Sequence, residues 1–266
     1  MRMFLKYILC FVTLLVDISA FAENHTPVIR EQHKIIVDGV EENWRLEWIG
    51  PTKPACGPED PGWMTCPCTG FAFGERGNLE LVRSRPGEKE ERMAIAPLFK
   101  YGDDHPAGDQ EAALLRWDIY KKDFTDCDAP DFPSRVQARP VAKVMNFGDY
   151  DHDGRATEFI LQIGTLPCGK RMSVVVGISR HKPRLHAFST VEHPEKPLVL
   201  RVQHWESLLQ ANGPIRVIDW LCGDHASETE TELELRAEAG RIHAKQRDYT
   251  CAEKGKRKQL IKEEAR

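Results

Sequence analysis

Four short apolar runs between residues 141 and 189 constrain the fold more than any other feature of this 266-residue sequence. Turn-forming residues such as Gly, Asp and Pro separate the runs. This alternation of apolar runs and turns is typical of consecutive antiparallel strands. We therefore expect a four-stranded antiparallel meander from Val141–Phe147, Phe159–Gly164, Met172–Ser179 and Arg184–Ser189.

The rest of the chain also favours strands. Trp44–Ile49 alternates apolar and polar residues, which is the period of a half-buried strand. Glu232–Ala237 and Arg241–Tyr249 flank an Ala-Gly turn and predict a hairpin. Gly74–Gly77 reads as a turn between two further strands, and Trp205–Ala211 as a short helix. The class is therefore mainly β, with antiparallel sheets and few short helices.

The N-terminus has the pattern of a signal peptide over residues 1–22. Arg2 and Lys6 form a positive region, Tyr7–Val16 is apolar, and Ala20 and Ala22 make a small-x-small cleavage site. We expect an exported protein, periplasmic or extracellular, with no membrane span after the signal. The mainly β domain is expected over 23–253, with a possible division into 23–135 and 136–253, followed by a basic tail over 254–266.

The cysteines favour disulfide bonds, because an exported chain meets an oxidising compartment. Seven of the eight cysteines follow the expected cleavage site, so one is left over and the connectivity stays open. Cys66 and Cys68 flank a proline and face the same way on an extended chain. A thiol-ligated metal site formed by these two and Cys56 is the alternative to disulfides.

The charge argues against nucleic acid as the main partner. Lys and Arg number 37 against 41 for Asp and Glu, a net charge of −4, whereas nucleic-acid-binding domains usually carry a basic excess. The segment Lys254–Lys262 (KGKRKQLIK) is basic and compatible with a helix. It could contact an anionic surface, and a solvated terminus explains it equally well.

The clearest chemical motif is D-x-D-x-D-G between the first two expected strands of the meander. Asp149, Asp151 and Asp153 place three carboxylates within five residues, followed by Gly154. These carboxylates repel one another, and a hard divalent cation would relieve the repulsion. Calcium takes six to eight oxygen ligands, so alternate carboxylates on a curled loop suit it better than magnesium.

The ligands that would complete the calcium sphere follow in the same loop. The carbonyl of Arg155 is expected to supply one oxygen, and Thr157 or Glu158 the last. An EF-hand is excluded because its twelfth loop position needs a bidentate Glu, and here that position is Ile160. An Asp- and Gly-rich turn without a metal is the simpler alternative.

The loop with its flanks, Val144–Ile163, resembles the calcium hairpin of FG-GAP and integrin-type propeller blades. The resemblance implies a propeller-blade-like meander around a calcium ion. In that family the closing acid is at loop position nine, whereas here Thr157 is ninth and Glu158 tenth. A full propeller needs several copies, and the sequence has one clear copy. We expect a single blade-like sheet within a larger β domain.

These features predict a binding or interaction module with a structural calcium ion, whose ligand is an unidentified protein or glycan. No G-x-S-x-G or H-E-x-x-H sequence is present, so these hydrolase signatures are absent. An enzyme is the less favoured hypothesis. The alternative is an exported hydrolase with carboxylates or histidines on its loops, since carboxylate pairs cannot be recognised from spacing alone.

Overall fold

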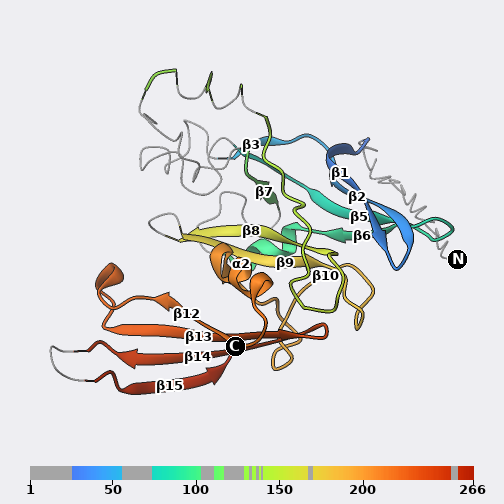
Figure 1. Ribbon diagram of the computed structural model, residues 1–266. Helices are drawn as coiled ribbons and strands as arrows, with labels where there is room; N and C mark the ends of the chain where they lie inside the picture. The colour runs from blue at the N-terminus through green and yellow to red at the C-terminus, as the bar shows by residue number, and fades with distance from the viewer. Residues whose placement is uncertain are drawn as a thin grey trace, which may run out of the picture.

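The computed structural model describes residues 26–55, 74–102, 111–116, 129–131, 134–135, 138, 140–166, 170–252 and 257–266. The expected signal peptide and Cys56, Cys66 and Cys68 lie outside these residues. The fold class is confirmed: the described chain is mainly β, with four antiparallel sheets (Figure 1).

Two sheets come from the N-terminal part of the chain. The larger has the order β1-β2-β5-β6 and the smaller β3-β4-β7. Their strands are β1 (Val28–Val37), β2 (Val40–Trp48), β3 (Lys53–Ala55), β4 (Gly74–Gly77), β5 (Leu79–Ser84), β6 (Glu91–Ala94) and β7 (Ala112–Leu114), with a 3-10 helix η1 (Ala96–Tyr101) after β6.

The expected turn at Gly74–Gly77 is wrong, because this segment is strand β4 and pairs with both β3 and β7. Gly74 and Gly77 are buried in the small sheet. A Cβ on Gly77 would lie 3.5 Å from Trp48 and from the carbonyl oxygen of Pro51. Both glycines are therefore strand residues inside a sheet, and a Cβ at Gly77 would make only ordinary contacts.

The central sheet contains three of the four expected meander strands. They are β8 (Glu158–Leu166), β9 (Lys170–Gly177) and β10 (His186–Ala187), and the fourth strand is β11 (Leu200–Arg201). Strand β9 pairs with β8 along one edge and with β10 and β11 along the other.

The expected first strand, residues 141–147, lies outside the sheets and is a correction to the predicted meander. The carboxylate of Glu31 accepts hydrogen bonds from the backbone N–H of Val144 (2.7 Å) and Met145 (3.1 Å). A side chain from β1 thus takes backbone donors that a neighbouring strand would otherwise satisfy. Strand β11 occupies the fourth place in the sheet instead.

The sheet of β8 and β9 is buried on both faces. Val174 and Val176 belong to one core with Trp44 of β2, whereas Val175 belongs to a second core with Trp205. A strand covered on both faces is apolar without alternation. The first core joins residues from both sides of position 135, and the expected division there stays a prediction.

The C-terminal sheet follows a helix that packs between it and the central sheet (Figure 1). The expected helix and hairpin are confirmed. The elements are α2 (Val202–Gln210), β12 (Ile215–Trp220), the 3-10 helix η3 (Asp224–Ala226), β13 (Thr229–Glu238), β14 (Arg241–Thr250) and β15 (Leu260–Ala265), with strand order β12-β13-β14-β15.

The expected basic tail contributes a strand to this sheet, within the residues that the structure describes. Leu260–Ala265 is strand β15, not a helix, and it pairs antiparallel with β14. Lys258 forms an ion pair with Glu230, and Lys262 forms one with Glu264 (2.7 Å). The local charge pattern does not show this pairing, because the partner strand supplies the hydrogen bonds.

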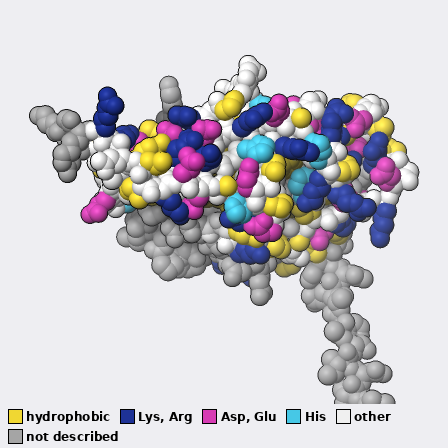
Figure 2. Space-filling view, turned by 90° about the horizontal axis from the view of Figure 1, so that it is seen from below, with side chains coloured by type: hydrophobic (Ala, Val, Ile, Leu, Met, Phe, Trp, Pro, Cys, Tyr) yellow, Lys and Arg dark blue, Asp and Glu magenta, His cyan; other side chains and the backbone are white. Residues whose placement is uncertain are grey.

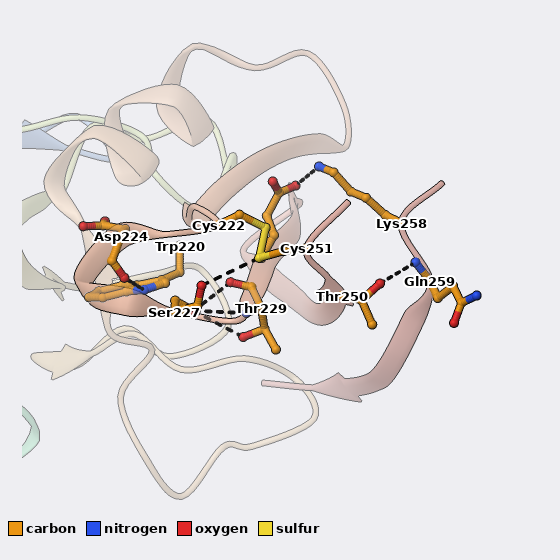
Figure 3. The surroundings of a disulfide bond; sticks show 10 residues. Trp220, Cys222, Asp224, Ser227, Thr229, Thr250, Cys251, Lys258 and Gln259 are labelled. Atoms are coloured by element: carbon orange, nitrogen blue, oxygen red, sulfur yellow. Dashed lines mark hydrogen bonds and ion pairs between the residues drawn. A yellow bond between two sulfur atoms is a disulfide. The ribbon is translucent and has the colours of Figure 1, made fainter. Parts of the chain in front are cut away.

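One disulfide, Cys222–Cys251, ties the end of β12 to the end of β14 across 29 positions of sequence (Figure 3). Beside it, the indole N–H of Trp220 donates to the carbonyl oxygen of Asp224 (3.1 Å), and the Ser227 hydroxyl donates to that of Thr229 (2.8 Å). The expectation of disulfide bonding is thereby confirmed.

Positive and negative side chains are interspersed on the face that Figure 2 shows from below. On the C-terminal sheet, Arg247 pairs with Glu234 (2.8 Å) and with Glu263 (2.6 Å). Such cross-strand pairs suit a solvated sheet face. Within the described residues, no helix is both long enough and apolar enough to span a membrane.

Candidate metal centre

The D-x-D-x-D-G loop is closed at its base by backbone pairing. The N–H of Gly148 donates to the carbonyl oxygen of Glu158 (2.8 Å), and the N–H of Glu158 donates back (3.3 Å). Inside the loop, the Asp149 carboxylate accepts the N–H groups of Asp153 and Gly154, each at 2.9 Å. Gly154 has φ +89°, which glycine adopts without strain. These contacts define the loop conformation.

Three carboxylates converge in this loop. Asp149, Asp151 and Glu158 each offer an oxygen, and these oxygens lie within 4.8 Å of one another. We call these three residues the acidic cluster. Asp151 and Glu158 are 0% exposed, and Asp149 is half-buried. This arrangement could hold a metal ion, because carboxylate oxygens are the preferred ligands of hard cations.

Two neighbouring groups hold the Glu158 carboxylate in place. The N–H of Tyr150 donates to Oε2 (2.8 Å). The hydroxyl of Thr157 lies 2.6 Å from Oε1 and 2.9 Å from the carbonyl oxygen of Ile178. Of the two candidates for the closing position, Glu158 thus belongs to the acidic cluster, and Thr157 orients it.

The cluster lacks a cationic partner among the described residues. No Lys, Arg or His in that part of the chain forms an ion pair with Asp149, Asp151 or Glu158. Burial raises the pKa of Glu158 to about 9 and that of Asp151 to about 7, and neighbouring carboxylates contribute to both shifts. Burial and mutual repulsion therefore disfavour the fully ionised cluster, and either protonation or a bound cation would relieve this.

One oxygen of the cluster accepts no hydrogen bond from the part of the chain that the structure describes. Asp151 Oδ2 is buried and accepts no hydrogen bond from the described residues, while Oδ1 accepts the N–H of Asp153 (3.1 Å). Leaving a buried carboxylate oxygen unpaired costs about 1–3 kcal/mol or more. A bound cation would compensate for that cost directly.

Asp153 does not join the cluster, although the sequence motif includes it. Its Oδ2 accepts the backbone N–H of Arg180 (2.6 Å) and faces Arg155 Nη2 (3.1 Å). Arg155 also pairs with Asp38 through Nη1 (3.0 Å). Cationic and backbone donors thus neutralise Asp153, and the Arg155 guanidinium has a structural role. The proposed ligation by the Arg155 carbonyl stays a prediction.

Sequence reasoning missed a contact from the C-terminal sheet. The turn between β13 and β14 reaches the loop, where the N–H of Gly240 donates to the carbonyl oxygen of Asp151 (2.9 Å) and that of Ala239 donates to His152 (3.1 Å). The Ala-Gly turn is visible in the sequence, but its packing against a distant loop depends on how the sheets are arranged.

Comparison with models of protein families, with curated proteins and with solved structures finds no match for this chain. The functional argument therefore depends on the geometry of the site.

Proposed function

We propose that this chain is an exported, disulfide-bonded β-module in which the loop over residues 148–158 binds a structural calcium ion, and that it acts by binding a protein or glycan. The observation that supports calcium binding is the acidic cluster: three carboxylate oxygens within 4.8 Å, without a cationic partner among the described residues. Within this cluster, the buried Oδ2 of Asp151 accepts no hydrogen bond from the described residues, which also favours a bound cation.

Calcium fits this ligand set better than other common metals. All three ligands are carboxylates, which suits a hard cation, and there is no thiolate or imidazole among them. Magnesium demands near-ideal octahedral geometry and keeps several waters, which suits the burial of Asp151 and Glu158 less well. The resemblance to an FG-GAP calcium hairpin is part of this proposal, with Glu158 as the closing acid.

The burial of the cluster supports a structural role over a catalytic one. Asp151 and Glu158 are 0% exposed, whereas a carboxylate acting on a substrate must reach it within hydrogen-bond distance. An ion at this position would stabilise the turn that leads into β8. We therefore favour a binding module over the alternative of an exported hydrolase.

The proposal of export has separate support. The Cys222–Cys251 bond is compatible with an oxidising compartment. Contact with an anionic surface through residues 254–266 has less support, since Lys258 and Lys262 form ion pairs with neighbouring glutamates.

Terbium luminescence tests the metal site directly, because Tyr150 lies in the loop between two cluster residues. We expect Tb³⁺ emission on tyrosine excitation, displaced by Ca²⁺ at far lower concentration than by Mg²⁺. Glu158→Gln should weaken binding at least tenfold. Glu206→Gln, an exposed acid outside the cluster, is the matched control and should not. Absence of sensitised emission, or emission that Ca²⁺ does not displace, would contradict the proposal.

A further inference from the structure

The turn between β13 and β14 makes two hydrogen bonds to the candidate metal loop and a third to His181, in the turn after β9. We call residues 239–240 the hairpin tip. The N–H groups of Ala239 and Gly240 donate to the carbonyl oxygens of His152 (3.1 Å) and Asp151 (2.9 Å). The ring Nε2–H of His181 donates to the carbonyl oxygen of Ala239 (2.7 Å). The tip therefore connects the C-terminal sheet to the loop beside the central sheet.

Asp151 takes part in both the cluster and this attachment. Its side chain belongs to the acidic cluster, and its main-chain carbonyl accepts the Gly240 amide. His152, which accepts the second amide, has φ +56°, an uncommon conformation for a residue with a side chain. A change in the backbone at Asp151 that separates the carboxylates would therefore move both carbonyl acceptors.

A side chain at Gly240 would crowd the neighbours of the tip and would also face the positive φ of +82°. A Cβ there would lie 2.8 Å from His181 Cδ2 and 3.4 Å from Asp151 Oδ2. A side chain at this position would thus reach the Asp151 oxygen that accepts no hydrogen bond from the described residues. The conformation of the cluster and the position of the tip depend on the same few atoms.

We propose that an ion bound in the metal loop holds the hairpin tip in its docked position and so couples the C-terminal sheet to the central sheet. We call this ion-dependent docking the latch. This inference rests on the proposed function. Without a cation, repulsion among the ionised carboxylates opposes the backbone geometry that presents the two acceptors. With the ion bound, that geometry is favoured. Because coupling is reciprocal, docking of the tip strengthens ion binding by the same factor.

The latch acts locally on the sheet. The middle of β13 packs on α2 through an apolar core that contains Leu233, Leu235 and Trp205 and that also includes Tyr150 of the metal loop. The Cys222–Cys251 bond holds the opposite end of the β13–β14 hairpin. Loss of the ion therefore releases the tip, while the rest of the sheet stays packed.

Hydrogen exchange on the mature chain tests the latch without any substitution. We expect the Ala239 and Gly240 amides to exchange at least tenfold faster in EGTA with Mg²⁺ than in Ca²⁺. The amides of Leu235 and Ala244, which pair across the same hairpin, are the internal control and should change less than twofold. Equal protection of the tip amides in a sample that demonstrably binds Ca²⁺ would overturn the latch and leave the proposed function intact.

A glycine pair gives the reciprocal test. Gly240→Ala should undock the tip and weaken Ca²⁺ binding at least fivefold without removing any ligand. Gly39→Ala is the matched control: Gly39 occupies the β1–β2 turn with φ +80°, against +82° at Gly240, but has no atom within 4 Å of its Cβ position. Equal Ca²⁺ affinity in the two variants would overturn the latch. Absence of Ca²⁺ binding by the parent would overturn both proposals.

Discussion

Asp151→Asn should have opposite effects on stability with and without calcium. Two ionised carboxylate oxygens within 4.8 Å of each other repel by at least about 3 kcal/mol at an effective dielectric constant of about 20. The substitution removes the repulsion of Asp151 with both Asp149 and Glu158. Protonation relieves part of this repulsion in the parent. We therefore expect the variant to be about 1–3 kcal/mol more stable than the parent in EGTA.

In calcium the parent should be at least as stable as the Asp151→Asn variant. For a dissociation constant of about 10⁻⁴–10⁻³ M, as in extracellular calcium modules, calcium at about 10 mM stabilises the parent by about 1.4–2.7 kcal/mol. A domain of this size gains about 2–4 °C in Tm per kcal/mol, so the parent should melt about 3–10 °C higher. Asp151→Asn loses a charged ligand and should show little of this shift.

The assay is thermal unfolding followed by circular dichroism, in calcium and in EGTA at matched ionic strength. Asp153→Asn is the control, because Asp153 belongs to the sequence motif but pairs with Arg155 instead of joining the cluster. It should lower Tm in both buffers and keep the calcium shift. Identical melting of the parent in both buffers, or a full calcium shift in Asp151→Asn, would refute the reasoning.

Three further predictions concern stability. Arg83→Met should lower the free energy of unfolding by about 3–5 kcal/mol, because it leaves the 0% exposed carboxylate of Glu42 without its bidentate partner. Urea unfolding measures this loss, and the double variant Arg83→Met with Glu42→Gln should recover part of it. Reduction of Cys222–Cys251, which closes a separation of 29 residues, should cost about 3–4 kcal/mol, and an unchanged denaturation midpoint in reductant would contradict this. Burial lowers the pKa of His186 from 6.5 to about 4, so the unfolded chain binds more protons than the folded chain between these pH values. Stability should therefore fall by up to about 3 kcal/mol as the pH decreases from about 6.5 to 4. His186→Phe should flatten this part of the pH profile of Tm.

Local patterns were sufficient to predict much of the secondary structure. The alternation at Trp44 and Trp48, and the Ala-Gly turn in the C-terminal hairpin, depend on interactions between near neighbours. The apolar run Val174–Val176 predicted a strand, and the structure shows that both of its faces are buried. Predictions were less successful where a distant group supplied the hydrogen bonds. Val144 is the clearest example, because its amide is bound by the Glu31 carboxylate.

The candidate site also combines features that follow from local sequence with features that depend on distant residues. That acidic residues gather in one loop before a strand can be read from the sequence, because their spacing is a local property. Which of these carboxylates come together depends on the folded chain. Asp153 turns toward Arg155 and the amide of Arg180, while Glu158 points inward beside Asp149 and Asp151. The direction of a carboxylate follows the donors that surround it, and these include both neighbours in the loop and the Arg180 amide, which only the folded chain brings to Asp153.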